Sequence, residues 1–164
     1  MFKHILVPLD GSHLAEAAMP AALELASRFN SKLSLARVTR TPYIASGLDG
    51  SAYVDFGMTL RQQEFDEADA YLQMMRRNLL QKNYPVEIFI REGDSIAEAI
   101  LAIAEEQDVD TIVMSTHGRG GMSRLVFGSV ADRVLRQATV PVVLIRARED
   151  TLQWTKPQNI ETIV

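Results

Sequence analysis

The residues best suited to chemistry form a glycine-rich stretch between an apolar run and a helical run. The stretch consists of Ser115–Gly118, nine further residues, and the pair Gly128–Ser129. Glycines let a backbone approach a ligand closely, and the N–H groups at a helix N-terminus favour a bound anion. Gly118, Gly121 and the helix that Ser129 opens would together bind phosphate, most simply the phosphate of a nucleotide.

The same stretch also fits a connection that binds nothing. Ser129 and Asp132 have the spacing of a capping box, which would account for the serine without a ligand. Asp132 adds negative charge to the first helical turn and competes with a bound anion, whereas Arg119 and Arg124 could offset it. From this segment alone, both interpretations stay open.

A second candidate is the carboxylate that follows the first apolar run, in Pro8-Leu9-Asp10-Gly11-Ser12. At the end of a parallel strand, Asp10 can accept hydrogen bonds from ribose hydroxyls. The Gly-Ser pair that follows suits an aspartate in a turn or helix cap equally well.

The elements that must position these residues alternate along the chain. Helical stripes of apolar residues, with a period of three to four, lie between short runs rich in Val, Ile and Leu. The runs indicate buried parallel strands and span Ile5–Leu9, Leu33–Val38, Val86–Ile90, Thr111–Met114 and Val140–Ile145. The alternation predicts an α/β fold, a doubly wound parallel sheet with helices on both faces. Its ligand site is expected beyond the carboxyl ends of the strands.

The helical segments carry further signals. The first has apolar residues at Leu14, Ala18, Ala21 and Leu25, and Pro20 inside it predicts a kink or a late start. Ser95 and Glu98 form a capping box before the stripe Ile96, Ile100 and Ile103. The remaining stripe contains Phe65, Ala68, Leu72, Met75 and Leu79.

Two segments depart from the alternation. Residues 41–60 carry three glycines, a proline and three aromatic residues, which predicts a long functional or disordered loop. Residues 148–164 form a polar tail that contains the one tryptophan, Trp154. We therefore expect one domain over residues 1–147, followed by the tail.

Composition limits the function classes. The chain has 164 residues, no cysteine and a net charge of −4, which excludes thiol chemistry and disfavours a broad nucleic-acid surface. The N-terminus lacks the pattern of a signal peptide, and no apolar run reaches the length of a membrane helix. We expect a cytoplasmic protein with no membrane insertion.

Motifs for catalysis and metal binding are missing. The chain has neither a P-loop, a G-x-G-x-x-G fingerprint after the first strand, nor a G-x-S-x-G elbow. His13 and His117 each follow a strand and could meet near the site, but no metal-ligand spacing links the three histidines. We expect no dedicated metal site, no catalytic residues and no fast turnover, with Mg²⁺ at most carried on a ligand's phosphates.

With these residues in view, the chain resembles the universal stress protein family, ATP-binding type, over about residues 1–147. The resemblance rests on Ile5–Ser12, Arg91–Asp94, Asp110–Gly120, Leu125–Val130 and Pro141–Ile145. The family's signature G-x2-G-x9-G-[ST] matches here at Gly118, Gly128 and Ser129. The resemblance implies a Rossmann-like five-stranded sheet of order 3-2-1-4-5, with ATP, ADP or AMP at the switch point between the first and fourth strands.

Carried over by position, the resemblance assigns a role to each part of the site. Asp10 would bind the ribose, and Val38, which ends the second strand, would lie against adenine. Phosphates would be held by Gly118, Gly128, Ser129 and the amide of Val130. The other implied binding residues are Pro8, Leu9, Met114, Ser115, Arg119 and Gly121.

The chain departs from the signature at its first glycine, which is Ser115 here. If that position needs a positive φ or a very close backbone approach, serine weakens binding. If it needs only a small residue, the hydroxyl could add a phosphate contact.

Three functional hypotheses follow. The first is a nucleotide-binding regulatory protein of the stress response, whose occupancy acts on an unidentified protein partner. The second is an interaction protein of the same fold whose nucleotide site is weakened at Ser115. The third is a slow ATPase, which the absence of a marked phosphate lysine and paired carboxylates disfavours.

The resemblance also implies a homodimer formed by the last strand, Val140–Ile145, because an uncovered apolar edge invites pairing. The tail would be a frayed terminus or, given Trp154 and the apolar end Ile160–Val164, would pack on the partner subunit. The loop at 41–60 is expected to close over bound nucleotide.

Overall fold

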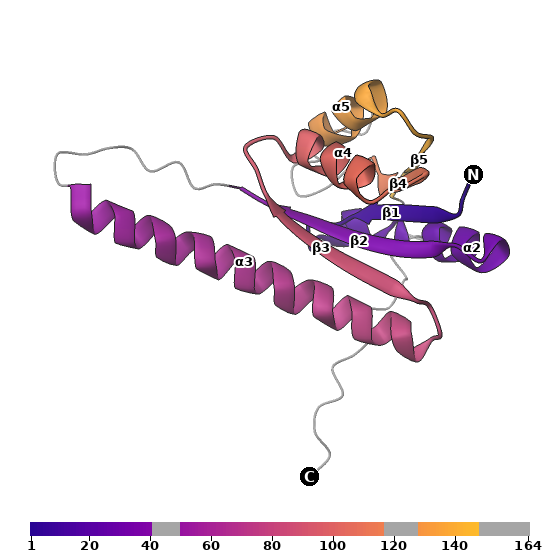
Figure 1. Cartoon of the computed structure of the whole chain (residues 1–164), viewed down its shortest axis with the longest axis horizontal. Helices are drawn as coiled ribbons and strands as arrows, with labels where there is room; N and C mark the ends of the chain where they lie inside the picture. The colour runs from indigo at the N-terminus through magenta and orange to yellow at the C-terminus, as the bar shows by residue number, and fades with distance from the viewer. Residues whose placement is uncertain (41–49, 117–127, 148–164) are drawn as a thin grey trace, which may run out of the picture.

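The described residues form a parallel five-stranded sheet flanked by helices (Figure 1). This computed structural model describes residues 1–40, 50–116 and 128–147, with the side chains of 50–56 left aside. The strands are β1 (His4–Pro8), β2 (Lys32–Thr39), β3 (Val86–Glu92), β4 (Thr111–Ser115) and β5 (Val142–Ile145). Their order is β3-β2-β1-β4-β5 and every pairing is parallel, which confirms the predicted fold class.

The helices cover both faces of the sheet. They are α1 (His13–Glu16), α2 (Met19–Phe29), α3 (Gly50–Gln81), α4 (Ile96–Glu106) and α5 (Ser129–Gln137). Alternate side chains of a strand point to opposite faces, so the core has two parts. Ile5, Val7 and Leu35 pack with α2 and α3, whereas Leu6, Ile112 and Met114 pack with α4 and α5.

Local sequence signals predicted several helix starts correctly. Helix α1 ends at Glu16 and α2 begins at Met19, with Pro20 in its first turn, so the predicted late start is confirmed. A proline is tolerated there because the first N–H groups of a helix have no partner within it. Ser95 is the N-cap of α4, as predicted, since its Oγ accepts from the Glu98 N–H; this bond is one half of the expected capping box.

The prediction of a loop through residue 60 is wrong, because α3 begins at Gly50 and runs for 32 residues. Elongating an existing helix costs less than nucleating one, so a well-anchored helix can continue into a segment with poor helical propensity. The anchors are the buried Ala68, Leu72, Met75 and Leu79. Phe65 was expected in the same stripe, but it is 46% exposed.

Strand β5 begins at Val142 rather than Val140 and lies at one edge of the sheet. Pro141, which precedes it, accepts a hydrogen bond from the Ile112 N–H. In the part of the chain that the structure describes, no helix is both long and apolar enough to cross a membrane. Residues 41–49 and the tail 148–164 lie outside the described residues, so the domain division stays a prediction.

Candidate functional site

A cavity of about 560 Å³ opens beyond the carboxyl ends of β1, β2 and β4. Nine of the predicted site residues are described, and all nine line it: Pro8, Leu9, Asp10, Val38, Met114, Ser115, Gly128, Ser129 and Val130. The other three, Gly118, Arg119 and Gly121, lie outside the described residues. Segments far apart in sequence therefore meet at one point, between the first and fourth strands, where the strand order reverses.

The lining also contains residues that the sequence did not assign to the site. They come from the end of β2, from the residue after β4, from α3 and α4, and from α1 and the start of α5. The set is Ala15, Ala36, Arg37, Thr39, Arg40, Glu64, Glu67, Ile96, Ile100, Thr116 and Ala131. Arg37, Thr39 and Arg40 lie at the carboxyl end of a predicted strand and could have been found by that rule. Glu64 and Glu67 could not, because only the packing of α3 brings them here.

Asp10 lies in a turn, as one of its two predicted roles requires, and it also lines the cavity. Its Oδ1 accepts a hydrogen bond from the Ser12 N–H at 2.8 Å, and Ser12 Oγ in turn accepts from the Ala15 N–H at the start of α1. Asp10 is thus the aspartate of a turn and also part of the cavity wall. The turn fixes where its carboxylate lies.

Ser115 is the last residue of β4, where it pairs with Ile145 of β5 and is 6% exposed. The described non-glycine residues with positive φ are Phe2, Asn30, Asn83 and Asp108, so Ser115 is not among them. An extended strand position accepts any residue of suitable size. In this fold the serine therefore meets no backbone strain at the position where the family signature has glycine.

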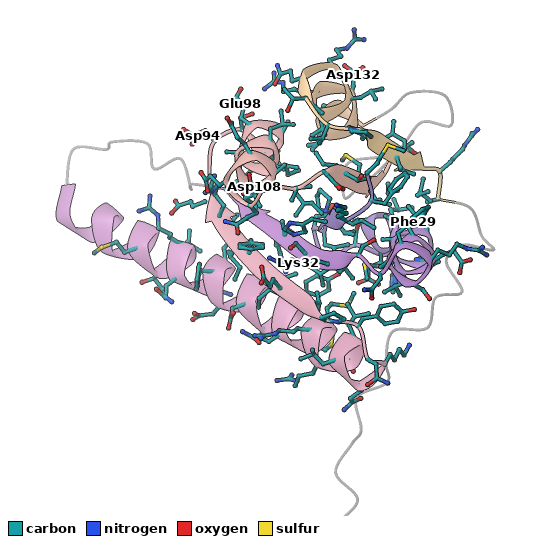
Figure 2. The ribbon with its side chains drawn as sticks, turned by 45° about the vertical axis from the view of Figure 1, so that its right-hand side comes forward. Phe29, Lys32, Asp94, Glu98, Asp108 and Asp132 are labelled. Carbon is teal, nitrogen blue, oxygen red and sulfur yellow. The ribbon has the colours of Figure 1, made fainter. Side chains whose placement is uncertain are left out.

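The prediction that Ser129 caps α5 is wrong. Gly128 is the N-cap residue, with no side-chain cap bond, and its carbonyl accepts the first helical bond from the Asp132 N–H at 2.9 Å. Asp132 lies on α5 away from the sheet (Figure 2), where it pairs with Arg136 at 2.9 Å. The alternative explanation for Ser129 as a cap is thereby removed, and Ser129 is one of the residues that line the cavity.

The amide of Gly128 is already used within the protein. Its N–H donates to the Thr116 carbonyl at 2.8 Å, which ties the start of α5 to the end of β4. The amides that precede the helical ladder are then those of Ser129, Val130 and Ala131. These three N–H groups, at the positive end of the helix dipole, are the ones suited to an anion in the cavity.

Next to the cavity, polar side chains from α1, α3 and β2 form a buried cluster. Tyr71 Oη donates to Glu16 Oε1 at 2.9 Å, and the Arg37 guanidinium lies 5.4 Å from the centre of the Tyr71 ring. Burial raises the pKa of Tyr71 far above its usual value, and the carboxylates of Glu16 and Asp10 raise it further. The phenol is therefore protonated at physiological pH and remains a hydrogen-bond donor.

Charges of both signs face the cavity. Among the described lining residues, Asp10, Glu64 and Glu67 are acidic, and Arg37 and Arg40 are basic. His13 is exposed and pairs with Glu16 at 3.7 Å, whereas His117 lies outside the described residues. Within residues 1–40, 50–116 and 128–147, no group of three or more His, Asp or Glu side chains could hold a metal ion.

An open parallel sheet with helices on both faces and a cavity at its switch point defines a doubly wound α/β protein. Residues 1–146 match the model of the universal stress protein family. The chain belongs to that family, as its sequence motifs predicted.

The similarity to known proteins extends over nearly the whole chain. Universal stress protein YxiE of Bacillus subtilis is 31% identical over 149 residues, which are 89% of this chain and 100% of that protein. The solved structure of MJ0577, a universal stress protein of Methanocaldococcus jannaschii, has 26% identity and a TM-score of 0.78, covering 90% of this chain and 98% of that one. A universal stress protein solved in complex with cAMP shares the fold at 19% identity, with a TM-score of 0.56 and coverage of 90% and 98%.

Proposed function

We propose that this universal stress protein binds an adenine nucleotide, with ATP as the first candidate, and that occupancy regulates its interaction with a protein partner. The observation that carries the proposal is the convergence of nine residues expected from the sequence on one cavity of about 560 Å³. That volume lies in the range of small-molecule and cofactor sites.

The chemistry of the lining supports each part of such a ligand. The base would lie against apolar residues, Val38 at the end of β2 and Met114 at the end of β4. The ribose hydroxyls would donate to Asp10, whose carboxylate is held by the turn at Ser12. The phosphates would face Ser129 and the amides of Val130 and Ala131, with Mg²⁺ bound to the phosphates rather than to a protein cluster.

The proposal is for a binding protein rather than a catalyst. The favoured role needs only that the free and bound forms differ in a surface that a partner recognises. Phosphate release that exceeds an enzyme-free blank and that Asp10→Ala abolishes would instead support slow hydrolysis.

Isothermal titration of the full chain with ATP, ADP and cAMP tests the proposal. We expect saturable binding of at least one of the three below millimolar concentration. No heat with any of them near millimolar concentration would overturn it and favour an interaction protein without a nucleotide.

We also propose a homodimer through the edge strand β5. Side chains 142–145 are all half-buried in the single chain. The carbonyls of Pro141 and Ile145 accept bonds from the N–H groups of Ile112, in β4, and of Thr116, which follows β4. Because backbone groups alternate in direction along a strand, those of Val142 and Leu144 point to the open edge.

The alternation supplies a matched pair of variants. Leu144→Pro removes an N–H that points to the open edge, whereas Leu144→Ala removes similar packing and keeps that N–H. Sedimentation equilibrium should show a much weaker dimer for Leu144→Pro than for Leu144→Ala. A monomeric wild type, or equal dissociation constants for the two variants, would contradict pairing through β5.

A further inference from the structure

The cluster of Glu16, Tyr71 and Arg37 connects the cavity to the long helix α3. Arg37 is a cavity-lining residue with only 9% of its surface exposed. Its guanidinium lies over the Tyr71 ring, and its Nη1 donates to the Glu67 carbonyl of α3 at 3.4 Å. Arg37 therefore contacts α3 at two points, one turn apart, while it forms part of the cavity wall.

A second route joins the same cluster to Asp10. The Asp10 turn holds Ser12, and Ser12 caps α1, whose last residue is Glu16. Glu16 is 2% exposed and accepts the hydrogen bond from Tyr71. A carboxylate buried to this extent is costly to leave without donors, so movement of α1 or α3 alone would be opposed by this bond.

Helix α3 has a surface through which such a link could act. Residues 61–67 are all exposed, in contrast to the buried positions of the helix's C-terminal half. The N-terminal part of α3 also projects past the strands, as Figure 1 shows. Glu64 and Glu67, within the exposed segment, at the same time line the cavity.

We propose that Tyr71 and Glu16 are positioning residues that hold Arg37 at the cavity wall and couple nucleotide occupancy to α3. The inference rests on the proposed function, since it concerns the same cavity. A ligand that contacts Arg37 or Asp10 reduces the freedom of the cluster, and the hydrogen bond between Tyr71 and Glu16 passes that restriction to the helix. Nucleotide occupancy would then change the mobility of α3 around Glu67 and Tyr71.

The test combines ATP titration with amide hydrogen exchange of residues 60–75 of α3 in the full chain. In the wild type, saturating ATP should slow exchange in this segment. Tyr71→Phe keeps the ring under Arg37 and removes only the hydroxyl that donates to Glu16. It should bind ATP roughly three- to tenfold more weakly, and at saturation it should lose the ATP-dependent protection of α3.

Two variants separate coupling from simple structural damage. Tyr84→Phe is the matched control, because Tyr84 packs partly buried against the same core but does not line the cavity; it should behave as the wild type. Glu16→Gln keeps an oxygen that accepts from Tyr71, so it should retain more of the protection than Tyr71→Phe does.

The outcomes distinguish this inference from the proposed function. If the wild type binds ATP and α3 is not protected, or if Tyr71→Phe keeps full protection, the coupling is wrong and the nucleotide site stands. Equal loss of protection in Tyr71→Phe and Tyr84→Phe would also overturn the specific role of Tyr71. Absence of binding of ATP, ADP and cAMP by the wild type removes both.

Discussion

The two ends of the parallel sheet carry similar polar residues in different surroundings. At the amino ends, Asp110 accepts from the Lys3 N–H at 2.9 Å, and His4 Nε2 lies 2.7 Å from Ser34 Oγ. At the carboxyl ends, Asp10 and Ser115 line a cavity of about 560 Å³. The amino end thus joins its polar groups to one another across the strands, whereas the carboxyl end presents polar groups to an open volume.

This difference predicts which polar residues contribute to the stability of the fold and which contribute to ligand binding. A polar group bonded within the protein stabilises the fold modestly, and its loss should change the free energy of unfolding. A polar group in the cavity wall should matter more to a ligand. The variants below test this contrast, from the largest expected effect to the smallest.

Replacing the cavity aspartate should have the largest effect. Asp10→Ala is expected to weaken ATP binding by roughly 10- to 100-fold, because it removes a charged acceptor. The loss of the turn bond to Ser12 should cost at most about 1 kcal/mol of stability. Calorimetric titration measures the ATP affinity, and denaturant unfolding measures the free energy of unfolding. An unchanged ATP affinity would contradict a ligand-binding role for Asp10 at the carboxyl end of the sheet.

The aspartate at the other end provides the matched variant. Burial raises the pKa of Asp110, but bonds from the Lys3 and His4 N–H groups and from the Thr111 hydroxyl outweigh it and hold the pKa below the usual value. Asp110→Ala should therefore lower the free energy of unfolding at pH 7 by about 1–2 kcal/mol and leave ATP affinity unchanged. In the wild type this contribution is present above the ordinary carboxyl pKa and is lost as the pH falls through the lowered value. An Asp110→Ala variant that binds ATP less well would contradict the separation of the two ends.

His4 makes the amino end sensitive to acid. Burial lowers the pKa of His4 below 6.5, and the Lys32 ammonium lowers it further, against opposing effects of the Gln107 carbonyl, Glu87 and Asp110. The unfolded chain therefore binds more protons than the folded chain just below pH 6.5, so stability falls as the pH drops. Chemical unfolding between roughly pH 7 and 5 should show a smaller decrease for His4→Gln than for the wild type. An equal decrease would show that another group is responsible.

Removing the Ser129 hydroxyl should affect the ligand more than the fold. Because Gly128 caps α5 without a side-chain bond, Ser129→Ala is expected to change stability by less than about 0.5 kcal/mol. ATP affinity should fall by roughly three- to tenfold if the hydroxyl contacts a phosphate. A large loss of stability with unchanged ATP affinity would show that Ser129 contributes to the fold rather than to ligand binding.

Ser115→Gly should have the smallest effect on binding. The serine occupies an extended strand position, so glycine relieves no strain and should change ATP affinity by less than about threefold while costing about 0.5–1 kcal/mol of stability. Binding that appears only in the glycine variant would instead establish that the natural site is weakened at this residue.

Much of this architecture can be predicted from the sequence alone. The apolar runs located all five strands to within about two residues, because strands buried on both faces need continuous hydrophobic side chains. Pro20 and Ser95 set helix starts, since their effects depend only on neighbouring backbone groups. The rule that ligands lie beyond the carboxyl ends of strands brought Asp10 and Ser115 into the candidate site.

Tertiary structure decided the features that depend on distant residues. Helix α3 extends back to Gly50 because its C-terminal half is anchored on β2 and β3, although the local composition predicts a loop. Gly128 rather than Ser129 caps α5, and the Gly128 N–H bonds to the carbonyl of Thr116, on the far side of residues 117–127 in the sequence. The same holds for Tyr71 of α3, which lies under Arg37 of β2 and donates a hydrogen bond to Glu16 of α1. Local sequence specifies which backbone conformations are available, but only long-range packing specifies which side chains meet.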